Sequence, residues 1–171
     1  MATQKITSSQ YFKMLNILYF ALISTPFLFL IFIYIFSQSG GFIQNITFTM
    51  QQALLLAIPV GIAIPLAGSS LHSKRLAAIK INDVLSKKLT LYQVAFIIKM
   101  SLIEVAAFMC ILFYFMSSNA YLLVGFVISM FFGIMAKPSK EKLFAELKLS
   151  KKEMNILNSA DFVVIEREQT N

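Results

Sequence analysis

Residues 91–116 read LYQVAFIIKMSLIEVAAFMCILFYFM, and this run decides the class of fold. Only Lys99 and Glu104 are charged within it. As a helix, its 26 residues would measure about 39 Å at 1.5 Å per residue, whereas the hydrocarbon core of a bilayer is about 30 Å thick. The run therefore predicts a transmembrane helix that tilts or projects beyond the membrane surface.

Three further apolar runs, each without a charged residue, lie at residues 15–36, 49–71 and 121–136. A run of about 20 such residues is long enough to cross the hydrocarbon core as a helix. We therefore expect an all-α integral membrane protein whose residues 1–136 form a bundle of four transmembrane helices. A cleavable signal peptide is not expected, because no clean small-residue cleavage site follows the first run.

The overall composition agrees with a membrane protein. Hydrophobic residues make up 58% of the chain and charged residues only 13%, with a mean hydropathy of +0.75. Soluble domains usually contain about 25% charged residues. The net charge of +7 does not indicate nucleic-acid binding, because the basic residues lie next to the apolar runs. That placement is typical of cytoplasmic loops, where anionic lipid headgroups are the natural partner.

The distribution of Lys and Arg predicts the orientation in the membrane. Two of these residues precede the first run, five lie in residues 72–90 and seven lie in residues 137–171. The other two connections contain none. Because cytoplasmic loops are enriched in Lys and Arg, we expect a multi-pass protein of the bacterial inner membrane with both termini in the cytoplasm.

The connection at residues 72–90 is strongly basic, and apolar residues are interleaved with its charges. This pattern is typical of a short amphipathic helix that lies on a membrane surface. We expect this loop helix to contact anionic headgroups or a protein partner through five side chains, namely Lys74, Arg75, Lys80, Lys87 and Lys88.

Residues 137–171 form a polar tail with seven basic and six acidic residues. The tail predicts a short amphipathic helix after Pro138. Ser150 and Glu153 fit the capping box of a second short helix. The apolar segment at residues 162–165 is either a strand or a contact patch. The tail therefore predicts a helical cytoplasmic region that meets a partner or the membrane surface.

The second apolar run contains Pro59, Gly61, Pro65 and Gly68, which allows two interpretations. Proline and glycine break helices that line transport paths in some membrane proteins. Small residues also let neighbouring helices approach closely. We favour the close-packed helix, because no charged residue accompanies the prolines.

Glu104 and Lys99 are the candidate ion-binding residues, because a charge within a membrane costs about 2.5–3.5 kcal/mol at the helix centre. Lys99 lies nearer the cytoplasmic end, and its long side chain can reach the surface. Glu104 lies near the bilayer centre and needs a proton or a partner. Either Glu104 is protonated and hydrogen-bonded to Ser101, Tyr114 or a neighbouring helix, or it binds a proton or cation.

Other catalytic or ligand-binding chemistry is sparse. Cys110 is the single cysteine and His72 the single histidine, so neither a disulfide framework nor a Cys/His metal site is expected. We expect His72 to lie at the interfacial end of a helix. His72 is the only candidate general base, and no nucleophile is expected beside it. We therefore expect neither an enzyme nor a bound cofactor.

Two resemblances to known families add to this picture. The sequence YQVAFIIKMSLIEVAAF at residues 92–108, with KPSKEKL at 137–143 and LKLS at 147–150, resembles small four-helix bacterial inner-membrane proteins of unassigned activity. This resemblance covers roughly residues 50–155 and implies the four-helix membrane fold alone.

The second resemblance is local. The sequence SLIEVAAF at residues 101–108 is similar to the carboxylate-bearing helix of the rotary ATP synthase c-subunit. In that family a Glu on the second helix binds a proton or sodium ion, so the resemblance implies this role for Glu104. The chain lacks the polar loop motif of that family and has two additional apolar runs and a tail.

Two functional interpretations follow. The first is a non-catalytic accessory or interaction component whose basic loop and tail contact lipid or other membrane subunits. The second is a transport element that binds a proton or cation at Glu104. Because one carboxylate among four helices makes no obvious pathway, the second interpretation requires a homo-oligomer.

Overall fold

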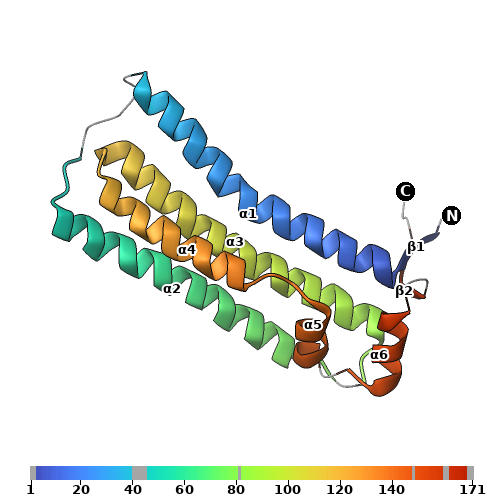
Figure 1. The fold of residues 1–171 in the computed structure, drawn as a ribbon. Coiled ribbons are helices and arrows are strands. Elements are labelled where there is room, and N and C mark those ends of the chain that lie inside the picture. The colour runs from blue at the N-terminus through green and yellow to red at the C-terminus, as the bar shows by residue number, and fades with distance from the viewer. Residues whose placement is uncertain (1–2, 40–45, 81, 148, 160–161, 169–171) are drawn as a thin grey trace.

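A computed structural model describes residues 3–39, 46–80, 82–147, 149–159 and 162–168 of the chain. Within these residues the protein is almost entirely helical, which confirms the all-α class (Figure 1). Four longer helices are α1 (Ser8–Gln38), α2 (Met50–Ala77), α3 (Leu85–Ser117) and α4 (Leu123–Met135), the last preceded by the 3-10 turn η1 (Ala120–Leu122). The shorter elements are α5 (Lys140–Leu147), α6 (Lys151–Asn158), β1 (Thr3–Thr7) and β2 (Val163–Glu168).

Three helices, α1, α2 and α3, are long and apolar enough to cross a membrane. The fourth candidate is shorter, because α4 has 13 residues and α5 follows it at an angle of 81°. Helices α1, α2 and α3 each extend beyond their apolar runs, since polar residues at a membrane surface can continue a helix. The protein is therefore a multi-pass helical membrane protein with three spans, or four if the bent pair forms one more.

The outer surface of the bundle is apolar. On α1 alone, Leu28 is 65% exposed, Ile35 63% and Phe32 60%. Soluble monomers rarely expose continuous apolar patches of this kind, so lipid is the natural solvent for this surface. The burial pattern therefore agrees with the membrane class that the composition indicates.

Helices α1 and α3 run parallel with a constant register. The Tyr11 hydroxyl of α1 donates a hydrogen bond to the Leu89 carbonyl of α3 at 2.8 Å. Farther along, the rings of Phe29 and Phe108 meet edge to face with centroids 5.0 Å apart. The paired residues differ by 78 and 79 positions, so any residue of α1 lies level with the α3 residue about 79 positions later.

Helices α2 and α4 approach each other closely through glycine. A Cβ at Gly61 would lie 2.6 Å from the carbonyl oxygen of Gly125, and a Cβ at Gly125 would meet the carbonyl of Ala57. Helix α2 is continuous through Pro59 and Pro65. These contacts support the close-packed interpretation of the second apolar run, because only residues without a side chain allow the two backbones to meet there.

The prediction of a separate amphipathic helix at residues 72–90 is wrong. Helix α2 continues to Ala77 and α3 begins at Leu85, which leaves a short turn between them. Asp83 holds this turn, because it accepts hydrogen bonds from the Lys80 amide at 3.0 Å and from the Lys87 ammonium at 2.8 Å. Leu76, Ile79 and Leu85 of this stretch pack against the core, whereas Val84 is exposed.

The tail folds back onto the end of the bundle at which α2 and α3 are connected (Figure 1). Strand β2 pairs antiparallel with β1, with Ile6 opposite Ile165, so the apolar segment at 162–165 contributes mainly to a strand. On α5, the Lys140 ammonium lies 5.2 Å from the centre of the Phe12 ring of α1. We call β1, β2, α5 and α6 together the end cap.

Candidate polar pocket between the second helix and the end cap

The end cap is attached to the bundle by a buried ion pair. The Lys88 side chain is 1% exposed, and its ammonium group lies 2.8 Å from a carboxylate oxygen of Glu153 on α6. The other Glu153 oxygen accepts a hydrogen bond from the Ser150 amide at 2.8 Å and completes the expected capping box. Burial raises the pKa of Glu153, but Lys88 and Ser150 together hold it below its ordinary value.

Lys88 therefore differs from the other four basic residues proposed to contact lipid or a partner. The structure places Lys88 inside the fold, whereas Lys74, Arg75, Lys80 and Lys87 are exposed. The Lys87 ammonium pairs with Asp83, whose pKa is lowered first by this hydrogen bond and then by the Lys80 amide. The basic surface thus consists of the end of α2, the turn and the first turn of α3.

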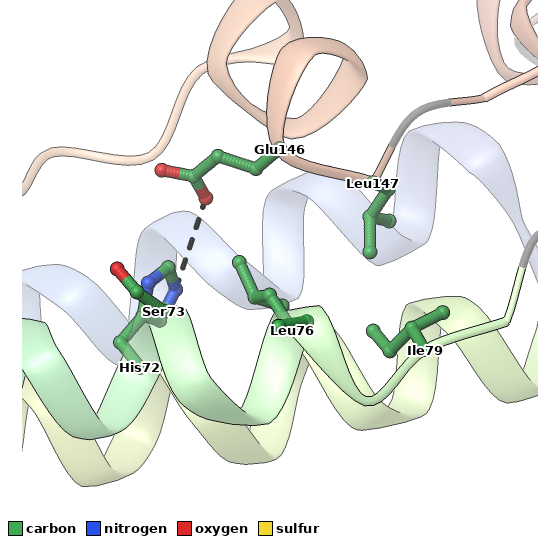
Figure 2. A pocket seen from close by; sticks show the side chains of 7 residues that line it. His72, Ser73, Leu76, Ile79, Glu146 and Leu147 are labelled. Carbon is green, nitrogen blue, oxygen red and sulfur yellow. Dashed lines mark ion pairs between the residues drawn. The ribbon is translucent and has the colours of Figure 1, made fainter.

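A cavity of about 280 Å³ lies between the end of α2 and the end cap (Figure 2). Side chains of α2 form one wall and α5 forms the other. The lining residues are His72, Ser73, Leu76, Ala77, Ile79, Glu146 and Leu147. Most of these side chains are apolar, so His72 and Glu146 determine the polarity of the pocket.

His72 lies near the end of α2, as expected, but it is almost fully buried. Its side chain points toward α5, and its Nε2 atom lies 3.8 Å from a carboxylate oxygen of Glu146 (Figure 2). This separation is longer than a hydrogen bond, and Nε2 has no hydrogen-bond partner within the described residues. The ring packs edge to face on Tyr92 of α3, with centroids 5.9 Å apart.

Glu146 brings three elements together at the pocket. The Tyr92 hydroxyl and the ammonium groups of Lys99 and Lys142 all act on its carboxylate electrostatically. Lys142 also donates hydrogen bonds to the carbonyls of Met135 at 2.8 Å and Lys137 at 3.1 Å. The site therefore combines an imidazole nitrogen, His72 Nε2, and the Glu146 carboxylate with two nearby cations.

The two candidate ion-binding residues do not form a site together. Lys99 of α3 interacts electrostatically with Glu146 of α5. Glu104 is half-buried on α3. By the register of α1 and α3, Glu104 lies level with Thr25, whose hydroxyl donates a hydrogen bond to the Ala21 carbonyl. Glu104 makes no hydrogen bond or ion pair with any other residue that the structure describes.

Sequence reasoning did not select Glu146, Tyr92 or Glu153 as site residues. Glu146 is one of six acids in a polar tail, and no local spacing places it beside His72. Glu153 carried a signal as a capping residue, but its pairing with Lys88 joins positions 65 apart. Within the described part of the chain, no three His, Cys, Asp or Glu residues lie close enough together to hold a metal ion.

The fold and the site together define a class of protein: a helical multi-pass membrane protein with a polar pocket at one end of its helix bundle. Comparisons with known protein families, with curated proteins and with solved structures find no match to this chain.

Proposed function

We propose that the protein is a non-catalytic accessory component of the bacterial inner membrane, whose end cap contacts another membrane subunit. The observation that carries this proposal is the buried Lys88–Glu153 ion pair, which fixes the tail against the bundle. A tail held in one position presents a defined surface, whereas a freely moving tail must lose conformational entropy when it binds. The exposed basic residues beside the end cap suit contact with anionic headgroups.

Four crossings with both termini in the cytoplasm are part of this proposal. The pairing of β1 with β2 supports an even number of crossings, because paired strands place both ends of the chain on one side. The basic residues at that end support a cytoplasmic location. Helix α4 is short for a span, so we propose that η1 and the turn before α5 complete the fourth crossing within the interfacial layers.

The accessory proposal is tested by native electrophoresis of complexes extracted from the source membrane in mild detergent. We expect the unaltered protein to migrate in a complex with other chains, and Lys88→Met to release it from that complex. Glu104→Gln should leave the complex intact. A protein that migrates alone, or as copies of itself only, would contradict the proposal.

The alternative is an oligomeric element that binds a proton or cation at Glu104. One observation favours this alternative. Glu104 has no partner among the described residues, although it lies in a predicted span, where an unpaired charge is costly. This alternative predicts a proton or sodium flux in proteoliposomes that Glu104→Gln abolishes while the oligomer persists. Equal flux in both proteins, or none in the unaltered protein, would remove this alternative.

A further inference from the structure

A buried polar atom at the pocket is not hydrogen-bonded by any residue that the structure describes. His72 is 4% exposed, and its Nε2 atom, which points toward the Glu146 carboxylate at the pocket (Figure 2), has no hydrogen-bond partner among the described residues. Leaving such an atom without a partner is costly, so nearly all buried polar groups are hydrogen-bonded to protein or to ordered water. The cavity of about 280 Å³ is many times larger than one water molecule requires.

The groups around this atom define the chemistry of a ligand. A neutral imidazole can accept a hydrogen bond at Nε2, and the Glu146 carboxylate 3.8 Å away is a second acceptor. One ammonium group with several N–H donors can donate to both at once. The ammonium groups of Lys99 and Lys142 add positive charge nearby, which suits a phosphate. A molecule with both an ammonium and a phosphate group matches both halves of the site.

The position of the pocket indicates a lipid. His72 lies immediately after the second apolar run, at the level where the headgroups of one leaflet are expected. Leu76, Ile79 and Leu147 line the cavity and offer an apolar wall to the part of a lipid nearest the headgroup. The exposed Lys74 and Arg75 on the same helix end mark this level as the interfacial layer.

We propose that this pocket binds the headgroup of a phospholipid that carries a primary ammonium group, as phosphatidylethanolamine does. The ammonium donates to His72 Nε2 and Glu146, and the phosphate lies toward Lys99 and Lys142. This inference goes beyond the proposed accessory function and does not require a protein partner.

Phosphatidylcholine supplies a matched control lipid. Its headgroup has the same charges, but its three methyl groups remove every N–H donor. We would load the full-length protein from vesicles containing equal amounts of the two lipids and measure the retained lipid by native mass spectrometry. We expect retention of phosphatidylethanolamine to exceed that of phosphatidylcholine by about tenfold, the factor that one hydrogen bond to a charged group commonly provides.

Two variants locate the preference, and one variant controls for changes in charge. His72→Phe and Glu146→Gln should each reduce the preference to about one, whereas Glu141→Gln, on the same short helix but outside the pocket lining, should retain it. Equal retention of the two lipids by the unaltered protein, or a preference that survives both pocket variants, would overturn the proposal. Displacement of the lipid by equimolar glycerophosphoethanolamine would assign the site to a soluble ligand and overturn it as well.

Discussion

Lys88 of α3 and Glu153 of α6 lie 65 positions apart in the chain, yet their charged atoms are 2.8 Å apart in the interior of the protein. This contact joins the long third helix to the end cap. A buried charge is costly without its partner, so each residue depends on the other.

Replacing Lys88 by Met should therefore destabilise the end cap. We expect a loss of about 3 kcal/mol, near the low end for a broken buried pair, because 17% of the Glu153 side chain remains exposed. The measurement is thermal unfolding in detergent, together with protease sensitivity of the tail. Lys87→Met is the matched control, because its ion pair with Asp83 lies on the surface and should contribute little. Equal effects of the two substitutions would contradict the structural role of Lys88.

Acid should loosen the same contact. The folded pKa of Glu153 lies below its ordinary value of 4.5, so its contribution to stability is fully present above pH 4.5. That contribution is lost as the pH falls below 4.5 through the lowered value. Hydrogen exchange of residues 151–158, corrected for intrinsic rates, should show this loss. Lys88→Met should remove this acid step, and an unchanged step in that variant would assign it to another group.

Gly125→Ala should disturb the contact between α2 and α4. The added Cβ would meet the Ala57 carbonyl and would lie 2.6 Å from the Cys110 sulfur, so the helices must move apart. We expect a loss of about 1–3 kcal/mol, typical of overpacking, measured by unfolding in detergent. Gly133→Ala is the control, because its nearest neighbour is the flexible end of Ile23 at 3.3 Å. A control variant as unstable as Gly125→Ala would show that the close approach does not matter.

Tyr11→Phe tests the attachment of α1. The substitution removes the hydrogen bond to the Leu89 carbonyl without creating a large cavity, and it should cost about 1 kcal/mol. Tyr34→Phe, at an exposed position of the same helix, should be nearly neutral. Unfolding of both variants in the same detergent gives the comparison, and an effect at Tyr34 that matches the one at Tyr11 would rule out this hydrogen bond as the cause.

The long helices were predictable because their formation depends on local properties. Apolar length and the absence of charge predict α1, α2 and α3 from residues 15–36, 49–71 and 91–116 without knowledge of any neighbour. The ends of these helices were less predictable. Thr7 accepts a hydrogen bond from the first turn of α1, so this helix begins at Ser8, well before the apolar run at residue 15. Thr49 caps α2 in the same way, and that helix begins at Met50, next to the start of its run.

The wrong prediction of a loop helix at residues 72–90 shows the limit of reading structure from charge patterns. The same alternation of basic and apolar residues suits a helix on a membrane surface and the adjoining ends of two packed helices. The tail decides between them, because Leu143, Leu147 and Leu157 of the end cap join the same core as the apolar residues around the turn. The identity of this packing partner is not encoded within the loop.

By itself, the sequence determined the membrane class, the long helices and the excess of basic residues at one end of the bundle, because each depends on local composition and on the thickness of a bilayer. Only the tertiary structure decided that Lys88 is buried, that β1 pairs with β2 and that His72 faces Glu146. These contacts join residues distant in the chain. They form because charged and polar groups removed from water require partners, which the folding of the tail brings within reach.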